Sequence, residues 1–109
     1  MKQNFANISI PEDLIQAALA GDADEQFCLA CFYELKRRID YRYEGIAIHW
    51  FTRAAEQGLS YAQLALGYYF DDKRQNELAK EWYTRAAAQG NKDAQKALAR
   101  LRDDTPLSD

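Results

Sequence analysis

The amino-acid sequence predicts an all-α fold of about six helices arranged as stacked antiparallel pairs. Three observations favour this class: a segment that recurs, helical spacing of the apolar residues around it, and a glycine at the end of each copy. The segment Ala54-Ala55-Glu56-Gln57-Gly58 returns as Ala86-Ala87-Ala88-Gln89-Gly90, 32 residues later. Self-similarity at a period of about 20 to 50 residues is typical of repeat proteins, whose units bury their apolar faces against neighbouring units.

The repeat extends beyond this segment and has a third, degenerate copy earlier in the chain. Trp50-Phe51-Thr52-Arg53 matches Trp82-Tyr83-Thr84-Arg85 at the same offset of 32. Further matches at that offset are Ala47 with Ala79, Ala62-Gln63 with Ala94-Gln95, and Leu66 with Leu98. In the earliest copy Ala17-Ala18-Leu19-Ala20-Gly21 precedes Gln26, Leu29 and Ala30, which match Gln63, Leu66 and Gly67 at an offset of 37.

Apolar spacing and boundary residues place the six helices. Ala62, Leu66 and Phe70 lie at i, i+4 and i+8, which is one stripe of a helix. The predicted helices cover residues 11–20, 22–37, 42–57, 59–71, 74–89 and 91–102.

Several of these boundaries carry a chemical signal. Pro11 suits a first helical turn, Asp22 with Glu25 resembles a capping box, and Asn91 can cap the last helix. Glycine takes the left-handed conformation that follows a last turn without a Cβ penalty. The glycines in such positions are Gly21, Gly58 and Gly90.

Large aromatic side chains are expected to fill the space between consecutive units. Trp50 and Trp82 supply most of this apolar area, while alanine and glycine let helix backbones approach closely. Trp82 is therefore predicted to be a core residue whose replacement by alanine costs about 3–5 kcal/mol.

The chain is short enough for a single domain, residues 1–109. Within it we predict an N-terminal half repeat at 11–21, full repeats at 22–58 and 59–90, a capping helix at 91–102 and a flexible tail at 103–109.

Charge and hydropathy exclude several classes of partner. The net charge of −3 argues against general nucleic-acid binding, which needs a clustered basic surface. The sequence has no apolar run near the roughly 18 residues of a membrane span, so no membrane association is expected. Because the start does not read as a signal peptide, the predicted location is cytoplasmic, or periplasmic if a leader has been removed.

The order Ala-x-x-Trp-(Phe/Tyr)-Thr-Arg-Ala-Ala-x-Gln-Gly, followed by Ala-Gln-x-x-Leu-Gly, resembles the Sel1-like repeat, a relative of the tetratricopeptide repeat. The resemblance covers roughly residues 17–101 and implies a right-handed α-solenoid. The chain departs from the family in the loop between paired helices: a Gly-x-Gly-Val turn is usual, but residues 36–42 and 71–76 differ.

The resemblance implies an adaptor or scaffold that holds a partner protein or peptide. Sel1-like proteins generally have no catalytic centre, and bacterial members often serve secretion, toxin-immunity or envelope pathways. A fold class does not fix the partner. The alternative is a structural homo-oligomer, a homodimer for example, formed through open solenoid ends near Ile8, Ile10, Leu14 and Ile15.

A contact surface is predicted on the first helix of each pair, which in such arrays lines the concave face. Tyr61 and Tyr68 lie seven residues apart and share a face, and tyrosine and arginine are favoured in binding hot spots. Packing of these tyrosines on neighbouring helices is the alternative. The predicted contact residues are Tyr61, Tyr68, Arg100, Cys31 and Asp24.

A basic loop edge is the second predicted surface, because equivalent loops stack in a solenoid. It is either a solvated edge or an anchor for an acidic partner segment or, less favoured, RNA. Its members are Lys36, Arg37, Arg38, Arg42, Lys73 and Arg74.

No residue pattern predicts catalysis, a metal site or a cofactor. Cys28 and Cys31 have redox or zinc spacing, but they lie inside a predicted helix without a second ligand pair, so a structural role is favoured over reversible oxidation. His49, the single histidine, has no nucleophile constellation beside it. We therefore expect a protein that is not an enzyme.

Overall fold

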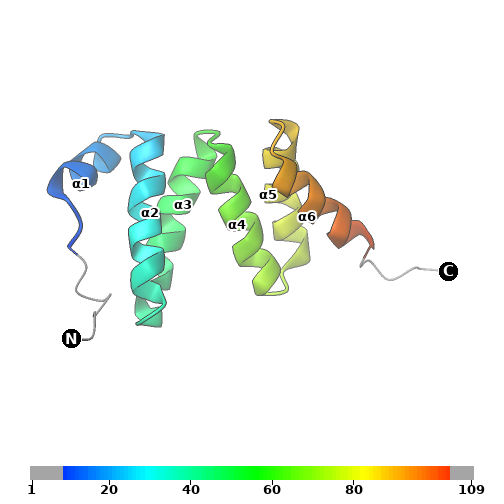
Figure 1. Cartoon of the computed structure of the whole chain (residues 1–109), viewed down its shortest axis with the longest axis horizontal. Helices are drawn as coiled ribbons and strands as arrows, with labels where there is room; N and C mark the ends of the chain where they lie inside the picture. Colours follow the sequence, from blue (N-terminus) through cyan, green and yellow to red (C-terminus); the bar gives the residue numbers. More distant parts are fainter. Residues whose placement is uncertain (1–8, 104–109) are drawn as a thin grey trace. The chain divides into compact units, whose positions relative to one another are not determined.

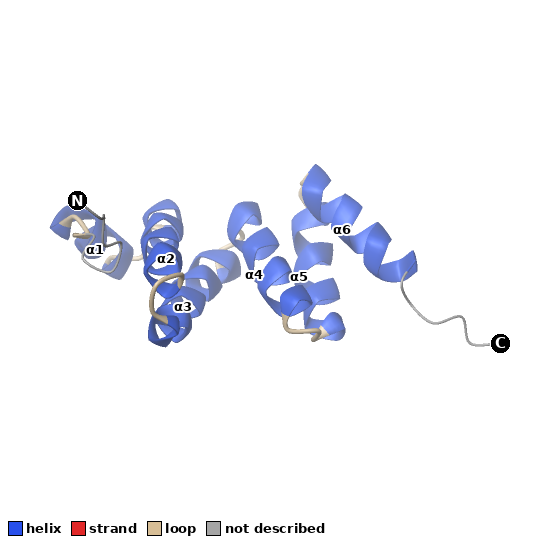
Figure 2. Cartoon of the chain, turned by 60° about the horizontal axis from the view of Figure 1, so that its bottom comes forward, coloured by secondary structure: helices blue, strands red, loops and turns tan. Residues whose placement is uncertain are grey.

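The computed structural model describes residues 9–103 and is all-helical over that range, which confirms the predicted fold class (Figure 1). No strand occurs among these residues (Figure 2), and none of their helices is long and apolar enough to cross a membrane. The elements are α1 (Glu12–Leu19), α2 (Ala23–Arg37), the short 3-10 helix η2 (Tyr41–Tyr43), α3 (Glu44–Glu56), α4 (Ser60–Asp72), α5 (Asn76–Ala88) and α6 (Lys92–Asp103). Residue 103 thus belongs to α6, and the rest of the predicted tail lies outside the described residues.

The chain divides into two compact units between Leu59 and Ser60, beside the predicted repeat boundary at 58/59. In the first unit α2 packs against α1 and α3, and η2 lies against α2 and α3. In the second unit α5 packs against α4 and α6. Within each unit consecutive long helices run antiparallel (Figure 1).

Three helices end in the same Schellman motif, which explains why Gly21, Gly58 and Gly90 recur. Their φ values are +106°, +98° and +90°, in the region that favours glycine. After α5, the Gly90 amide donates to the Ala87 carbonyl at 2.9 Å and the Asn91 amide to the Ala86 carbonyl at 3.2 Å. The carbonyls of the last turn, which have no partner inside the helix, are thereby satisfied.

The predicted N-terminal caps of α2 and α6 are confirmed. The Glu25 amide donates to the Asp22 carboxylate at 3.0 Å, and the Ala94 amide donates to the Asn91 side chain at 2.9 Å. The placement of Pro11 was wrong by one position. It precedes α1 with ψ 133°, outside the helical range, and its carbonyl accepts the amides of the first turn.

Two further predicted helix starts are each two residues early: α3 begins at Glu44, directly after η2, and not at residue 42, and α5 begins at Asn76 and not at residue 74. Arg74 has φ +60°, and its amide donates to Asp71 while the Gln75 amide donates to Phe70. These bonds form a fourth Schellman motif, with arginine in the glycine position. A residue other than glycine pays about 1–2 kcal/mol in the left-handed conformation, so arginine is rare at such a position. The sequence around Arg74 therefore gives no signal for the end of a helix.

In each unit two glutamines of the repeat form a hydrogen bond to each other and so link neighbouring helices. In the first unit Gln26 is fully buried, donates to the Ala18 carbonyl at 3.0 Å and accepts from Gln57 at 2.8 Å. In the second, Gln89 donates to Gln63 at 2.9 Å. The repeated glutamines therefore satisfy buried polar groups between helices, which accounts for their presence in each copy.

Replacing Gln26 by alanine is expected to lower the free energy of unfolding by about 1–3 kcal/mol, because the buried Ala18 carbonyl loses its side-chain partner. Urea denaturation followed by circular dichroism measures the change. Gln16→Ala is the matched control, since the Gln16 side chain is exposed and its hydrogen bond goes to the neighbouring Glu12 side chain of α1. Equal stability of both variants would show that the Gln26 bonds contribute nothing.

The aromatic core of the second unit is Tyr83 and not Trp82. Tyr83 is 0% exposed, whereas Trp82 is half-buried and lies against the Arg85 guanidinium, 4.6 Å from its ring centroid. The buried stripe of α5 is Ala79, Tyr83 and Ala86, at i, i+4 and i+7. The expectation that Trp82 is a core residue is therefore wrong. The buried stripe of α5 includes the next residue, Tyr83, and Trp82 lies beside this stripe.

Candidate functional site

Two predicted contact residues form an exposed tyrosine face on α4. Tyr61 is 63% exposed and Tyr68 is 47% exposed, although α4 buries Ala62 and Leu66 completely. Seven residues are two helical turns, so both tyrosines lie on one side of α4. We call Tyr61 and Tyr68 the tyrosine face.

Tyr68 lies edge-on against Tyr83, with ring centroids 5.8 Å apart. The Tyr83 hydroxyl donates to Oδ2 of Asp71 at 3.0 Å, and Arg100 pairs with the same oxygen. Burial, and then the hydrogen bond to Asp71, raise the pKa of Tyr83 well above its usual range, so the phenol remains a donor. These contacts connect the predicted residues Tyr68 and Arg100, which lie on α4 and α6, through α5.

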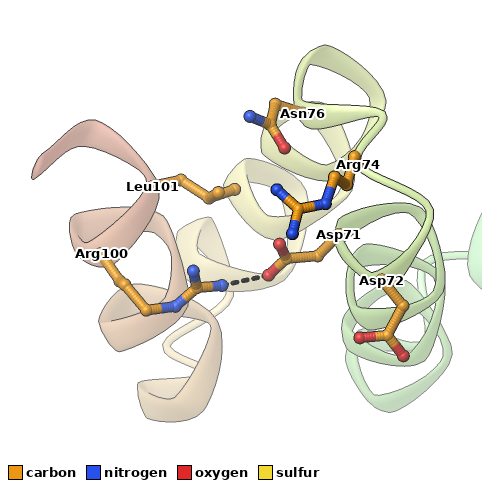
Figure 3. Close-up of a pocket in the computed structure, with 6 residues that line it drawn as sticks. All are labelled: Asp71, Asp72, Arg74, Asn76, Arg100 and Leu101. Carbon is orange, nitrogen blue, oxygen red and sulfur yellow. Dashed lines mark hydrogen bonds and ion pairs between the residues drawn. The ribbon is translucent and has the colours of Figure 1, made fainter. Parts of the chain in front are cut away.

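A polar pocket of about 630 Å³ lies beside this network in the second unit. Figure 3 shows Arg74 and Arg100 reaching toward Asp71 from two sides, while the carboxylate of Asp72 points away. The lining residues are Asp71, Asp72, Arg74, Asn76, Arg100 and Leu101. Sequence reasoning found Arg74 and Arg100 but not the others, because Asp71 and Arg100 are 29 positions apart and no local pattern relates them.

The other predicted contact residues, Asp24 and Cys31, belong to α2 in the first unit. Asp24 is exposed and Cys31 is half-buried. The latter lines a small apolar pocket of about 220 Å³. The remaining lining residues are Phe27, Cys28, Phe32 and Leu35.

The two thiols of α2 are poorly suited to redox chemistry. Burial raises the pKa of both, the acidic residues near Cys28 raise its pKa further, and the Cys28 thiol does the same for Cys31. Since the thiolate is the reactive form, a raised pKa lowers reactivity at neutral pH. Within residues 9–103 no cluster of three or more His, Cys, Asp or Glu could hold a metal ion.

The predicted basic loop edge is partly neutralised in the first unit. Arg37 pairs with Glu34, and Arg42 pairs with Asp40 at 2.7 Å. The hydrogen bonds from Arg42 hold the pKa of Asp40 below its usual value. The Lys36 ammonium lies 5.4 Å from the Tyr43 ring centroid, and Arg38 is exposed.

In the second unit the two predicted basic residues differ in surroundings. The Lys73 ammonium lies 5.5 Å from the Tyr69 ring centroid, whereas Arg74 lines the polar pocket. His49, by comparison, is exposed and contacts the Trp50 ring at 5.1 Å between centroids.

The surface predicted for homo-oligomers is only partly exposed. Leu14 is buried within the first unit, and Ile10 and Ile15 are half-buried. Ile8 lies outside the described residues. Leu19, at 56% exposed, is the largest apolar side chain that α1 presents to solvent.

Antiparallel helix pairs, repeated glutamines and Schellman endings define a helical-repeat protein of the class used for protein–protein interaction. The solved structure of a Sel1 repeat protein from Oxalobacter formigenes is similar, with a TM-score of 0.68 and 36% sequence identity, over 81% of this chain and 68% of that one. The chain belongs to the Sel1-like repeat family. No protein-family model matches the sequence, and neither does any curated protein.

Proposed function

We propose that this chain is a non-catalytic adaptor that binds a segment of a partner protein along the tyrosine face of α4. The observation that carries this proposal is the exposure of Tyr61 and Tyr68, at 63% and 47%, on a helix whose opposite side is buried. Arg100 lies at one end of this surface, where α6 meets the C-terminal end of α4. Sel1-like repeats are generally interaction scaffolds without a catalytic centre, in agreement with this role.

The physical reason for favouring tyrosines is their contact area. Each presents a large, rigid ring with a polar tip and loses little conformational freedom on binding. The core does not require Tyr61 to be aromatic, because its side chain lies mostly outside it. Tyr68 has one aromatic contact, with Tyr83, and is still about half exposed.

Replacing both Tyr61 and Tyr68 by alanine is expected to weaken partner binding by about 2 kcal/mol or more, roughly 30-fold. The partner is first captured from the native source and identified by mass spectrometry, and wild type and double variant are then titrated by calorimetry. Loss of the Tyr68–Tyr83 contact should lower stability by only about 0.5–1.5 kcal/mol.

Tyr41→Ala is the matched control, because Tyr41 is 79% exposed but lies in η2, outside the tyrosine face. It should bind like wild type. Equal affinities of the double variant and wild type would place the binding surface elsewhere, and unfolding of the double variant would assign the tyrosines to the core.

A further inference from the structure

We infer that the polar pocket at the C-terminal end of α4 binds a side-chain carboxylate of an acidic peptide segment, with Arg74 as the principal contact. The inference rests on the proposed function in taking the ligand to be a protein segment. It adds the chemical group that the pocket binds, a carboxylate, and the residue that contacts this group, Arg74.

Arg74 occupies a position that stability alone would give to glycine. Its φ of +60° places it in the left-handed region, and it ends α4 as Gly21, Gly58 and Gly90 end α1, α3 and α5. Strained backbone that packing does not require is found preferentially at functional sites. Among the described residues, the Arg74 guanidinium forms no ion pair that would explain the choice of arginine.

The charges around the pocket leave Arg74 as the available cation. Asp71 already accepts from Tyr83 and pairs with Arg100. Asp72 also lines the pocket, but Figure 3 shows its carboxylate directed away from the two arginines. The lining residues carry two positive and two negative charges, but Asp71 is engaged by Tyr83 and Arg100, so Arg74 is the cation that can meet an incoming anion. Asn76 adds an amide that can donate a hydrogen bond.

A carboxylate fits this arrangement better than a phosphate group. The planar guanidinium fork of arginine matches the two oxygens of a carboxylate. A phosphate monoester carries nearly twice the negative charge, and it would meet stronger repulsion from the Asp71 carboxylate than a singly charged group does. The pocket volume of about 630 Å³ is ample for an acidic side chain and part of its backbone.

The pocket also lies in line with the tyrosine face. Tyr68 and Asp71 are three residues apart on α4, about 4.5 Å along the helix axis. An extended peptide advances about 3.3–3.6 Å per residue. A segment in contact with Tyr68 would therefore bring an acidic side chain to the pocket one or two residues later.

The test uses two blocked peptides of the same glycine–serine–tyrosine background, one with two adjacent glutamates and one with two glutamines. Each is titrated into isotope-labelled full-length chain and followed by amide chemical shifts in NMR. The glutamate peptide should shift the amides of residues 71–77 and 98–102. The glutamine peptide should bind at least about tenfold more weakly, because it lacks the charge-assisted hydrogen bonds.

Arg74→Gly separates binding from folding. This variant should have an equal or higher melting temperature, since glycine adopts the left-handed conformation without strain, yet lose about tenfold or more in affinity for the glutamate peptide. Arg74→Gln should show the same loss. The matched control is Arg102→Gln, which removes an exposed α6 charge that does not line the pocket and should change affinity little.

The inference is overturned if the glutamine peptide binds as well as the glutamate peptide, if Arg102→Gln weakens binding as much as Arg74→Gln, or if no amide near the pocket shifts. The Tyr61→Ala/Tyr68→Ala variant distinguishes the two proposals. If it binds both peptides like wild type while Arg74→Gly loses the glutamate peptide, the tyrosine face is wrong and the pocket stands. The reverse pattern leaves the tyrosine face and removes the pocket.

Discussion

Replacing Tyr83 by alanine is expected to lower the free energy of unfolding of the second unit by about 3–5 kcal/mol, as for other large buried aromatic side chains. Tyr83 is 0% exposed and belongs to the apolar cluster formed by α5 and α6. It also donates to Asp71, the carboxylate that pairs with Arg100. Because small domains have total stabilities of about 5–15 kcal/mol, this single change removes a large part of the margin.

Urea denaturation followed by circular dichroism measures this loss, and two companion variants locate its origin. Tyr83→Phe keeps the ring and removes only the hydrogen bond to the Asp71 carboxylate, so it should cost about 1.5–3 kcal/mol, as for other hydrogen bonds to charged groups. Trp82→Ala should cost less than Tyr83→Ala, since Trp82 is only half-buried. If Trp82→Ala lowered the free energy of unfolding more than Tyr83→Ala, the assignment of Tyr83 rather than Trp82 to the core would be wrong.

Adding one methyl group at Gly67 is expected to destabilise the second unit even though alanine is the better helix former. A Cβ built at this position lies 2.4 Å from Cδ1 and Cε1 of the Tyr83 ring, closer than real contacts allow. Overpacking of a filled core costs about 1–3 kcal/mol, while glycine-to-alanine in a helix returns about 1 kcal/mol. The clash should therefore prevail, and Gly67→Ala should lose up to about 2 kcal/mol in urea denaturation.

A double-mutant cycle checks the assigned cause, because residues in contact give non-additive changes. In the Tyr83→Ala background the ring is absent, so Gly67→Ala should no longer destabilise and should instead stabilise by up to about 1 kcal/mol through helix propensity. Gly45→Ala is the control, since a Cβ at Gly45 in α3 meets nothing within 4 Å. Additive losses in the cycle would contradict a clash between Gly67 and Tyr83.

Local chemistry explains which parts of the fold were predictable from sequence. Helix ends at Gly58 and Gly90 depend on a backbone conformation that one residue type favours, and the Asp22 and Asn91 caps need only an oxygen near the next turn. Such signals act over a few residues. The spacing of apolar residues then gave the six helices and their pairing.

The errors at Trp82 and at the start of α5 have two different physical causes. Trp82 and Tyr83 are adjacent, and only the direction of the helix in the folded unit decides which of them the core receives. Arg74 ends a helix in a conformation that arginine rarely adopts, so the start of α5 was placed two residues early.

The candidate site was predictable only in part. The spacing of Tyr61 and Tyr68 predicts that they share one side of α4, but not that this side is exposed. Arg74 is predicted as part of the basic loop edge and Arg100 as a contact residue. Their common pocket was not predictable, because Asp71 pairs with Arg100 across 29 positions and also accepts a hydrogen bond from the Tyr83 hydroxyl on a third helix. Contacts of that kind depend on how α4, α5 and α6 pack within the unit.

The left-handed arginine at the end of α4 has a consequence for directed evolution. Because Arg74 has φ +60°, a library selected for heat resistance alone should accumulate glycine or asparagine at this position, which relieve the backbone at little cost. A library selected for capture of acidic segments should keep arginine. Sequences that look improved by thermal screening would then have lost the side chain for which the strain is tolerated.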